Sequence, residues 1–200
     1  MIIKKIAALC KSVKGVTLFD DEENGIQRIT DGYAVYPLYD MPRMDEKTIL
    51  AVLDVPGDKR GEFRVRSTKL PSTLNFRDDD DHERMLPEMD IGIVFRNRKM
   101  LPARTSRGLW FMNPKYLEPL NDLDGFEIYE RKGKDGNIYF AIKTGFMLQA
   151  IIMPELQEPE VLAGRLRRLA DELETTLHYQ TAAEDAEQFH VDADTGEVIT

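Results

Sequence analysis

Residues 137–156 read NIYFAIKTGFMLQAIIMPEL, the most apolar stretch of the chain. Two apolar runs of strand length lie on either side of Thr144-Gly145, and Pro154 ends the second run. Glycine adopts the positive φ that tight turns need, and proline cannot donate to a strand ladder. A strand with nearly continuous apolar residues is covered on both faces. The stretch therefore predicts two adjoining strands at the buried centre of a sheet.

The composition bounds the class of protein. A chain of 200 residues with 42% hydrophobic residues suits one domain or two small ones with a buried core. The apolar runs are far shorter than the roughly 20 residues of a membrane helix, and the N-terminus lacks the order of a signal peptide. We therefore expect a cytoplasmic protein that does not contact a membrane. The net charge of -9 leaves only a local basic face for contact with nucleic acid.

The N-terminal segment predicts a helix followed by three short strands. Apolar residues at helical spacing define one helix face, and lysines gather on the opposite face. The apolar residues are Ile2, Ile6, Leu9 and Val13, and the lysines are Lys4, Lys11 and Lys14. Gly15 supplies a C-cap, and the strands VTLFDD, GIQRIT and YAVYPL follow. The single cysteine, Cys10, lies beside the apolar face and is expected to be a buried thiol.

The middle of the chain predicts a second helix, a strand and a long loop. Asp45 is the expected N-cap of a helix that ends at Leu53, and GEFRVRS alternates as a strand does. Residues 69–89 show little periodicity and contain the acidic run 78–83. Adjacent aspartates point in different directions, so a solvated loop is favoured over a metal site. Strand character returns at 90–95 and 101–111.

The last part of this region repeats the order of the first. Asn113-Pro114 is expected to open a short helix that buries Tyr116, Leu117 and Leu120. The strands FEIYER, IYFAIK and FMLQAII follow, and Met-Pro ends both units at 41–42 and 153–154. The predicted fold is α+β with duplicated α-β-β-β units. Because hairpins are common and residue identity between the halves is low, a coincidental match remains the alternative.

Residues 1–156 resemble, in pattern, a single domain of the DNA sliding clamps. The segment NPKYLEPLNDLDGFEIYERKGKDGNIYFAIKTGFMLQAIIMPEL is similar to the last helix and strands of the bacterial beta-subunit clamp, which also closes on Met-Pro. IIKKIAALCKSVKGVTLFDDEENGIQRITDG resembles the helix and strand pair of a clamp. In that family the helices carry basic residues toward duplex DNA. The resemblance implies Lys4, Lys11, Lys14 and Lys115 as DNA-binding residues, whereas an ordinary solvated lysine face is the alternative.

The C-terminal extension departs from the clamp pattern. Residues 157–180 predict a helix with an apolar seam, and residues 181–200 predict a tail or a hairpin around Asp194-Thr195-Gly196. The seam consists of Val161, Leu162, Leu166, Leu169, Leu173 and Leu177, with Arg165, Arg167 and Arg168 outside it. It is expected to pack on its own domain, on a second copy or on another protein. The candidate partner-binding residues are Met153, Pro154, Leu162, Leu166, Leu169 and Leu173.

No catalytic motif is present, and no cofactor or metal is expected. The sequence lacks a phosphate-binding glycine loop, a nucleophile elbow and a zinc motif, and its three histidines lie in segments expected to be exposed. We therefore expect a noncatalytic, clamp-like, DNA-associated protein of phage or mobile-element type, acting in replication or as a scaffold. Because a clamp ring needs six such domains, a ring would require self-association. The alternative is a protein-interaction or assembly module that shares the fold without binding DNA.

Overall fold

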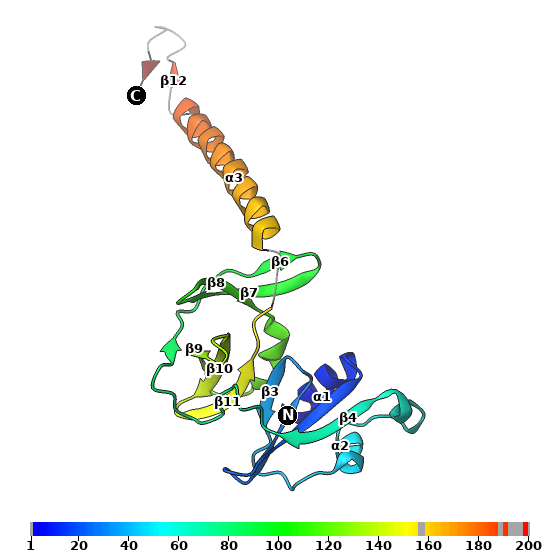
Figure 1. Cartoon of the computed structure of the whole chain (residues 1–200). Helices are drawn as coiled ribbons and strands as arrows, with labels where there is room; N and C mark the ends of the chain where they lie inside the picture. Colours follow the sequence, from blue (N-terminus) through cyan, green and yellow to red (C-terminus); the bar gives the residue numbers. More distant parts are fainter. Residues whose placement is uncertain (1, 156–158, 188–189, 192–197, 200) are drawn as a thin grey trace. The chain divides into compact units, whose positions relative to one another are not determined.

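The protein is a mixed α+β structure with one large sheet and a C-terminal helix (Figure 1). The computed structural model describes all residues except 1, 156–158, 188–189, 192–197 and 200. It divides the chain into two compact units, Met1–Glu155 and Leu156–Thr200.

The large sheet has 8 strands in the order β4-β1-β2-β3-β11-β10-β9-β5. Its first four strands are β4 (Arg64–Lys69), β1 (Gly15–Asp21), β2 (Ile26–Thr30) and β3 (Ala34–Pro37). The others are β11 (Met147–Ile152), β10 (Ile138–Thr144), β9 (Glu127–Lys132) and β5 (Arg84–Met85). Neighbours are antiparallel except β1 and β4, which are parallel.

The hairpin predicted from residues 137–156 is β10 and β11, and it lies inside the sheet. Every side chain of β10 from Ile138 to Lys143 is buried. Phe140 and Ile142 pack in the larger hydrophobic core, whereas Tyr139 and Ala141 pack in a second cluster. Successive side chains of a strand point to opposite faces, so both faces of the sheet are covered. This confirms the expectation of a buried central strand.

The larger core lies under the helices of the first unit. Helix α1 (Ile2–Ser12) buries Ile6, Leu9 and Cys10, and α2 (Glu46–Val52) buries Ile49. Asp45 caps α2, because its carboxylate accepts the amide N–H of Thr48 at 2.7 Å. A short 3-10 helix, η1 (Gly57–Glu62), links α2 to β4. Both helices and the Asp45 cap were predicted from the sequence, but the predicted C-cap Gly15 is the first residue of β1, and Lys14 adopts the positive φ of 51° after α1.

Before β9 the structure differs from the prediction of one helix. Two 3-10 turns, η2 (Pro114–Tyr116) and η3 (Glu118–Leu120), take its place. Asn113 caps η2 by accepting the Lys115 amide at 3.1 Å, as predicted. Pro119 has no amide hydrogen to donate, so it disfavours a continuous α-helix here. Tyr116, Leu117 and Leu120 are buried, also as predicted.

The remaining elements form a small sheet and the C-terminal unit. Strands β6 (Ile93–Phe95), β7 (Arg98–Thr105) and β8 (Gly108–Met112) make a 3-stranded sheet. In the second unit, α3 (Pro159–Glu187) extends beyond the predicted 157–180 at its C-terminal end. Strands β12 (His190–Val191) and β13 (Val198–Ile199) pair antiparallel, and the predicted turn at 194–196 lies outside the described residues.

Candidate functional site

The predicted basic face lies on α1 and is partly neutralised. Lys4 and Lys11 are exposed on α1, and exposed Lys14 follows it. The ammonium of Lys11 lies 3.9 Å from the Asp54 carboxylate, and that of Lys14 lies 2.8 Å from Glu62. The hydrogen bond between Lys14 and Glu62 raises the pKa of Lys14 and lowers that of Glu62. Acidic side chains that follow α2 and that end η1 therefore reduce the positive field along this face.

The fourth predicted lysine comes from another element. Lys115 lies on η2 and is half-buried, with its ammonium 4.7 Å from the centroid of the Tyr116 ring. Lys115 thus belongs to a different element from the lysines of α1, and its ammonium faces an aromatic ring. The predicted DNA-binding set is thus a short basic strip on α1 and a separate cation on η2.

Met153 and Pro154 are half-buried and serve the fold of the first unit. The Met153 side chain packs on the second hydrophobic cluster, and its amide donates to the carbonyl of Tyr33 at 2.8 Å. The adjacent Glu155 amide donates to the carbonyl of Phe111 at 2.8 Å. The Met-Pro segment is therefore tied to the β2–β3 turn and to β8.

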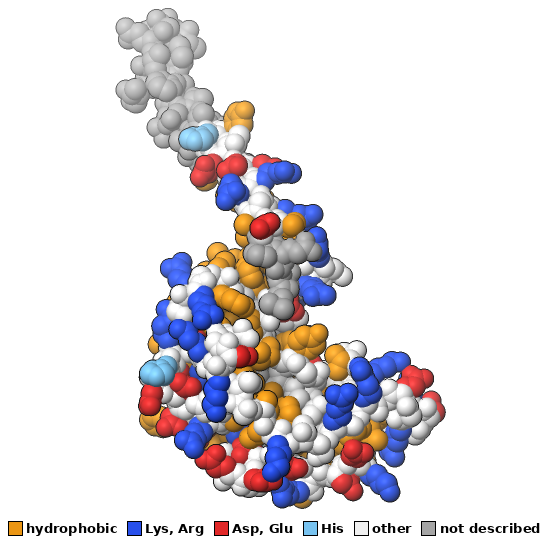
Figure 2. Space-filling model, in the orientation of Figure 1, with side chains coloured by type: hydrophobic (Ala, Val, Ile, Leu, Met, Phe, Trp, Pro, Cys, Tyr) orange, Lys and Arg blue, Asp and Glu red, His pale blue; other side chains and the backbone are white. Residues whose placement is uncertain are grey.

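The leucine face of α3 is largely exposed. Leu162 is buried and Leu166 is half-buried, whereas Leu169, Leu173 and Leu177 expose 53%, 57% and 60% of their surface. In Figure 2 hydrophobic side chains occur among charged ones along this helix. Three leucines at successive turns, each more than half exposed, form an apolar stripe (Leu169, Leu173 and Leu177).

A polar network that the sequence did not reveal organises residues 70–83, here termed the crossing segment. This segment joins β4 at one edge of the sheet to β5 at the other edge. Its backbone is held by two buried guanidinium groups, Arg28 on β2 and Arg131 on β9, which are 3% and 0% exposed. Arg28 donates to the carbonyl of Phe76 at 3.0 Å. Arg131 donates to the carbonyls of Asn75, Arg77 and Asp78 at 3.3, 2.8 and 3.1 Å.

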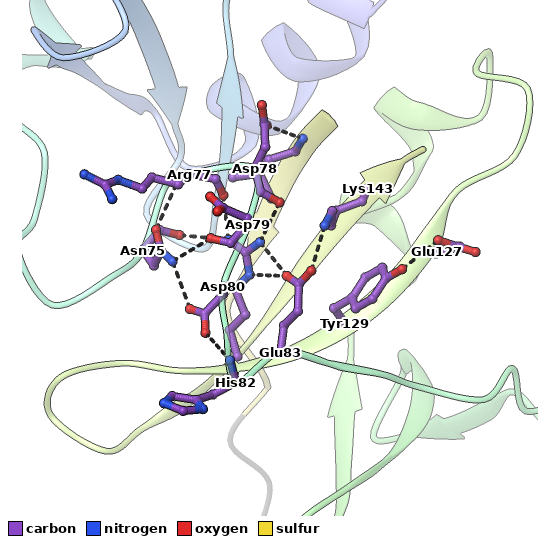
Figure 3. A network of polar contacts seen from close by, with 12 residues as sticks. Asn75, Arg77, Asp78, Asp79, Asp80, His82, Glu83, Glu127, Tyr129 and Lys143 are labelled. Atoms are coloured by element: carbon purple, nitrogen blue, oxygen red, sulfur yellow. Dashed lines mark hydrogen bonds and ion pairs between the residues drawn. The ribbon is translucent and has the colours of Figure 1, made fainter. Parts of the chain in front are cut away.

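Carboxylates of the crossing segment complete the network (Figure 3). Glu83 accepts from Arg131 at 2.8 Å and from the ammonium of Lys143 at 2.7 Å. Asp78 accepts the backbone amide of Leu148 at 2.8 Å. The prediction of a solvated acidic loop holds for the exposed Asp78, Asp79 and Asp81, but it was wrong for Glu83, whose side chain is 14% exposed and ion-paired. Arg131 and Lys143 lie within strands, and buried cations require acidic partners. Their position in strands was the sequence signal that such partners exist, although it did not identify them.

Asp80 fixes the local shape of the same acidic run. Its carboxylate accepts from the Asn75 side chain at 2.9 Å and from the His82 amide at 3.0 Å. Partial burial acts to raise the pKa of Asp80, but these hydrogen bonds outweigh it and the pKa is lowered. The carboxylate is thus ionised at neutral pH and acts as a structural acceptor.

An open cleft of about 880 Å³ lies between the crossing segment and the β1–β2 and β9–β10 turns. Its lining carries charges of both signs, including Glu23, Asp80, Lys132 and Lys134, with His82 exposed. In the part of the chain that the structure describes, no three His, Cys, Asp or Glu side chains are grouped as a metal site requires. We assign no catalytic role to this cleft.

Comparison with protein-family models, with curated proteins and with solved structures gave no match. Within the described residues, no helix combines the length and the apolar character needed to cross a membrane.

Proposed function

We propose that this chain is a noncatalytic protein-interaction or assembly module that binds another polypeptide through α3. The observation that carries the proposal is the apolar stripe, in which Leu169, Leu173 and Leu177 are each more than half exposed. Covering a leucine that is half exposed gains roughly 1 kcal/mol, so the stripe offers about 3 kcal/mol to a partner. A single exposed leucine is ordinary, but three in register along one helix favour an interaction surface.

The strand order supports a clamp-like architecture for the first unit. The β3–β11 pair lies at the centre of the sheet. On one side the strand order outward is β3, β2, β1, and on the other side it is β11, β10, β9, so each half runs from its third strand to its first. Helix α1 precedes β1, and the turns η2 and η3 precede β9. We infer that segments 1–42 and 113–154 are duplicated units related by a pseudo-twofold axis, as in one sliding-clamp domain. An experimental structure in which these segments fail to superpose would remove this support.

The interaction role can be tested by placing charges in the stripe. Leu169→Asp with Leu173→Asp adds two charges to the apolar face, and a matched control, Gly164→Asp with Thr175→Asp, adds them at exposed positions off the seam. Each form is measured for solution mass and, when immobilised, for capture of proteins from an extract of the cells that produce it. The proposal predicts an association that the control retains and the leucine variant loses. If wild type neither self-associates nor captures a protein in this way, the proposal fails.

Association with duplex DNA is a second candidate, favoured by exposed basic residues near one edge of the sheet. Lys4 and Lys11 are exposed on α1, and Arg64 and Arg66 are exposed on β4, which pairs with β1. Phosphate contacts depend steeply on salt and not on sequence. Replacing Lys4, Lys11 and Lys14 by Glu should abolish binding of a labelled duplex at low salt. Undetectable binding by wild type at low salt, or binding unchanged by the replacements, would exclude this role.

A further inference from the structure

We propose that a second copy of α3 covers the apolar stripe, with the two helices antiparallel. This inference rests on the proposed interaction role of α3 and names the partner and its orientation. It follows from the spacing of the leucines, from the charge distribution along the helix and from the exposure of the stripe.

The leucine spacing is that of a two-helix seam. Leu166, Leu169 and Leu173 are separated by three and four residues, which matches the alternating a and d positions of a heptad, whereas Leu162, four residues earlier, is already buried in the single chain. Leu177 prolongs the apolar face by one turn. A helix with this pattern buries the seam by packing it against another helix at a shallow angle.

Apart from Glu160 in its first turn, α3 carries basic residues before Ala170 and acidic residues directly after it. Arg165, Arg167 and Arg168 lie in the half before Ala170, and Asp171, Glu172 and Glu174 lie in the half after it. A parallel pair would place the basic halves together and the acidic halves together. An antiparallel pair places each basic half beside an acidic half, which lowers the electrostatic energy of the complex. The charge pattern of α3 therefore complements that of a second α3 in the opposite direction, which favours self-association over a different partner.

The antiparallel arrangement has a definite centre. With Leu169 of one copy packed on Leu173 of the other, the two-fold axis passes near Ala170 and each residue contact occurs twice. In this register, residues whose numbers add to about 342 lie level with each other, so Arg165, Arg167 and Arg168 of one copy lie beside residues 174–177 of the other. Ala170 flanks the seam at the axis and therefore lies near Ala170 of the second copy. In a parallel pair these two alanines lie on opposite sides of the seam.

Disulfide formation can test this arrangement in the full chain. Ala170→Cys should give a covalent dimer under mild oxidation, whereas the matched variant Ala163→Cys, one heptad earlier on the same side, should not. Wild type, which has only the buried Cys10, is the background control. Equal behaviour of the two variants would overturn the antiparallel arrangement. A monomeric wild type at about 100 µM would overturn the inference, since a specific helix pair should associate below that concentration. The interaction role would still stand if that monomer captured another protein through the stripe.

Discussion

Replacing Arg131 by Met should destabilise the first unit strongly and release the crossing segment. Arg131 is fully buried, and its guanidinium binds Glu83 and the carbonyls of Asn75, Arg77 and Asp78. Removing one partner of a buried ion pair costs about 3–5 kcal/mol. Each hydrogen bond to a charged group contributes roughly 1.5–3 kcal/mol. These costs do not add, because Lys143 still neutralises Glu83 and water can reach the exposed Arg77 and Asp78.

We therefore expect the free energy of unfolding to fall by about 3–5 kcal/mol, which urea titration measures directly. Amide hydrogen exchange should accelerate at Lys134 and Leu148, whose N–H groups bind Thr73 and Asp78 of the crossing segment at 2.9 and 2.8 Å. The control is Arg77→Met, which removes an ion pair to Glu23 whose side chains are 66% and 67% exposed. That variant should lose less than about 1 kcal/mol. A loss below about 1 kcal/mol for Arg131→Met, with unchanged exchange, would refute the assigned role of the network.

Three further predictions concern single side chains of the first unit. Burial acts to raise the pKa of Glu130, but hydrogen bonds from Ser106 and Arg84 lower it overall. This carboxylate therefore stabilises the fold above the unfolded pKa of about 4.3, and the contribution disappears as pH falls through the lower folded pKa. Urea titrations across that range should show a shallower acid dependence in Glu130→Gln than in wild type, and equal slopes would contradict this role. Burial, aided by the charge of Asp31, raises the pKa of Cys10 to about 12. A thiol reagent at pH 8 should label it only after unfolding, and rapid labelling of the native protein would be inconsistent with its burial. Phe146 is 91% exposed, so Phe146→Ser should change the free energy of unfolding by less than about 0.5 kcal/mol, and a larger loss in urea would show that it is covered.

The local elements of the fold were predictable because their signals are local. Turn glycines, the Asp45 cap and the apolar runs around Thr144-Gly145 identify hairpins and helix ends from neighbouring residues alone. The two 3-10 turns in place of one helix reflect Pro119, whose effect on a short helix depends on how the surrounding chain packs.

The polar network was not predictable, because its partners are distant in sequence. Arg131 binds Glu83 across 48 residues, and Lys143 reaches the same carboxylate across 60 residues. The lysine face shows the same limit. Its spacing placed Lys11 and Lys14 on one side of the N-terminal helix, but their partners, Asp54 and Glu62, come from segments brought there by the tertiary fold.

The exposure of the α3 leucines also depends on information beyond the helix. Periodicity predicts an apolar face over Leu162 to Leu177, yet it does not say which of these leucines are covered. The structure separates a buried Leu162 from the exposed Leu169, Leu173 and Leu177. This distinction, together with the change of charge sign near Ala170, is what carries the proposal of self-association.

Amide hydrogen exchange of α3 at several protein concentrations tests that proposal most directly. An antiparallel pair buries the apolar stripe on both copies, so amides of residues 166–177 should become protected as concentration rises through the dissociation constant. The Leu169→Asp and Leu173→Asp double variant should show no such rise, while the amides of β10 stay protected in both proteins. Protection of α3 that is the same at every concentration, and the same in the variant, would contradict the account.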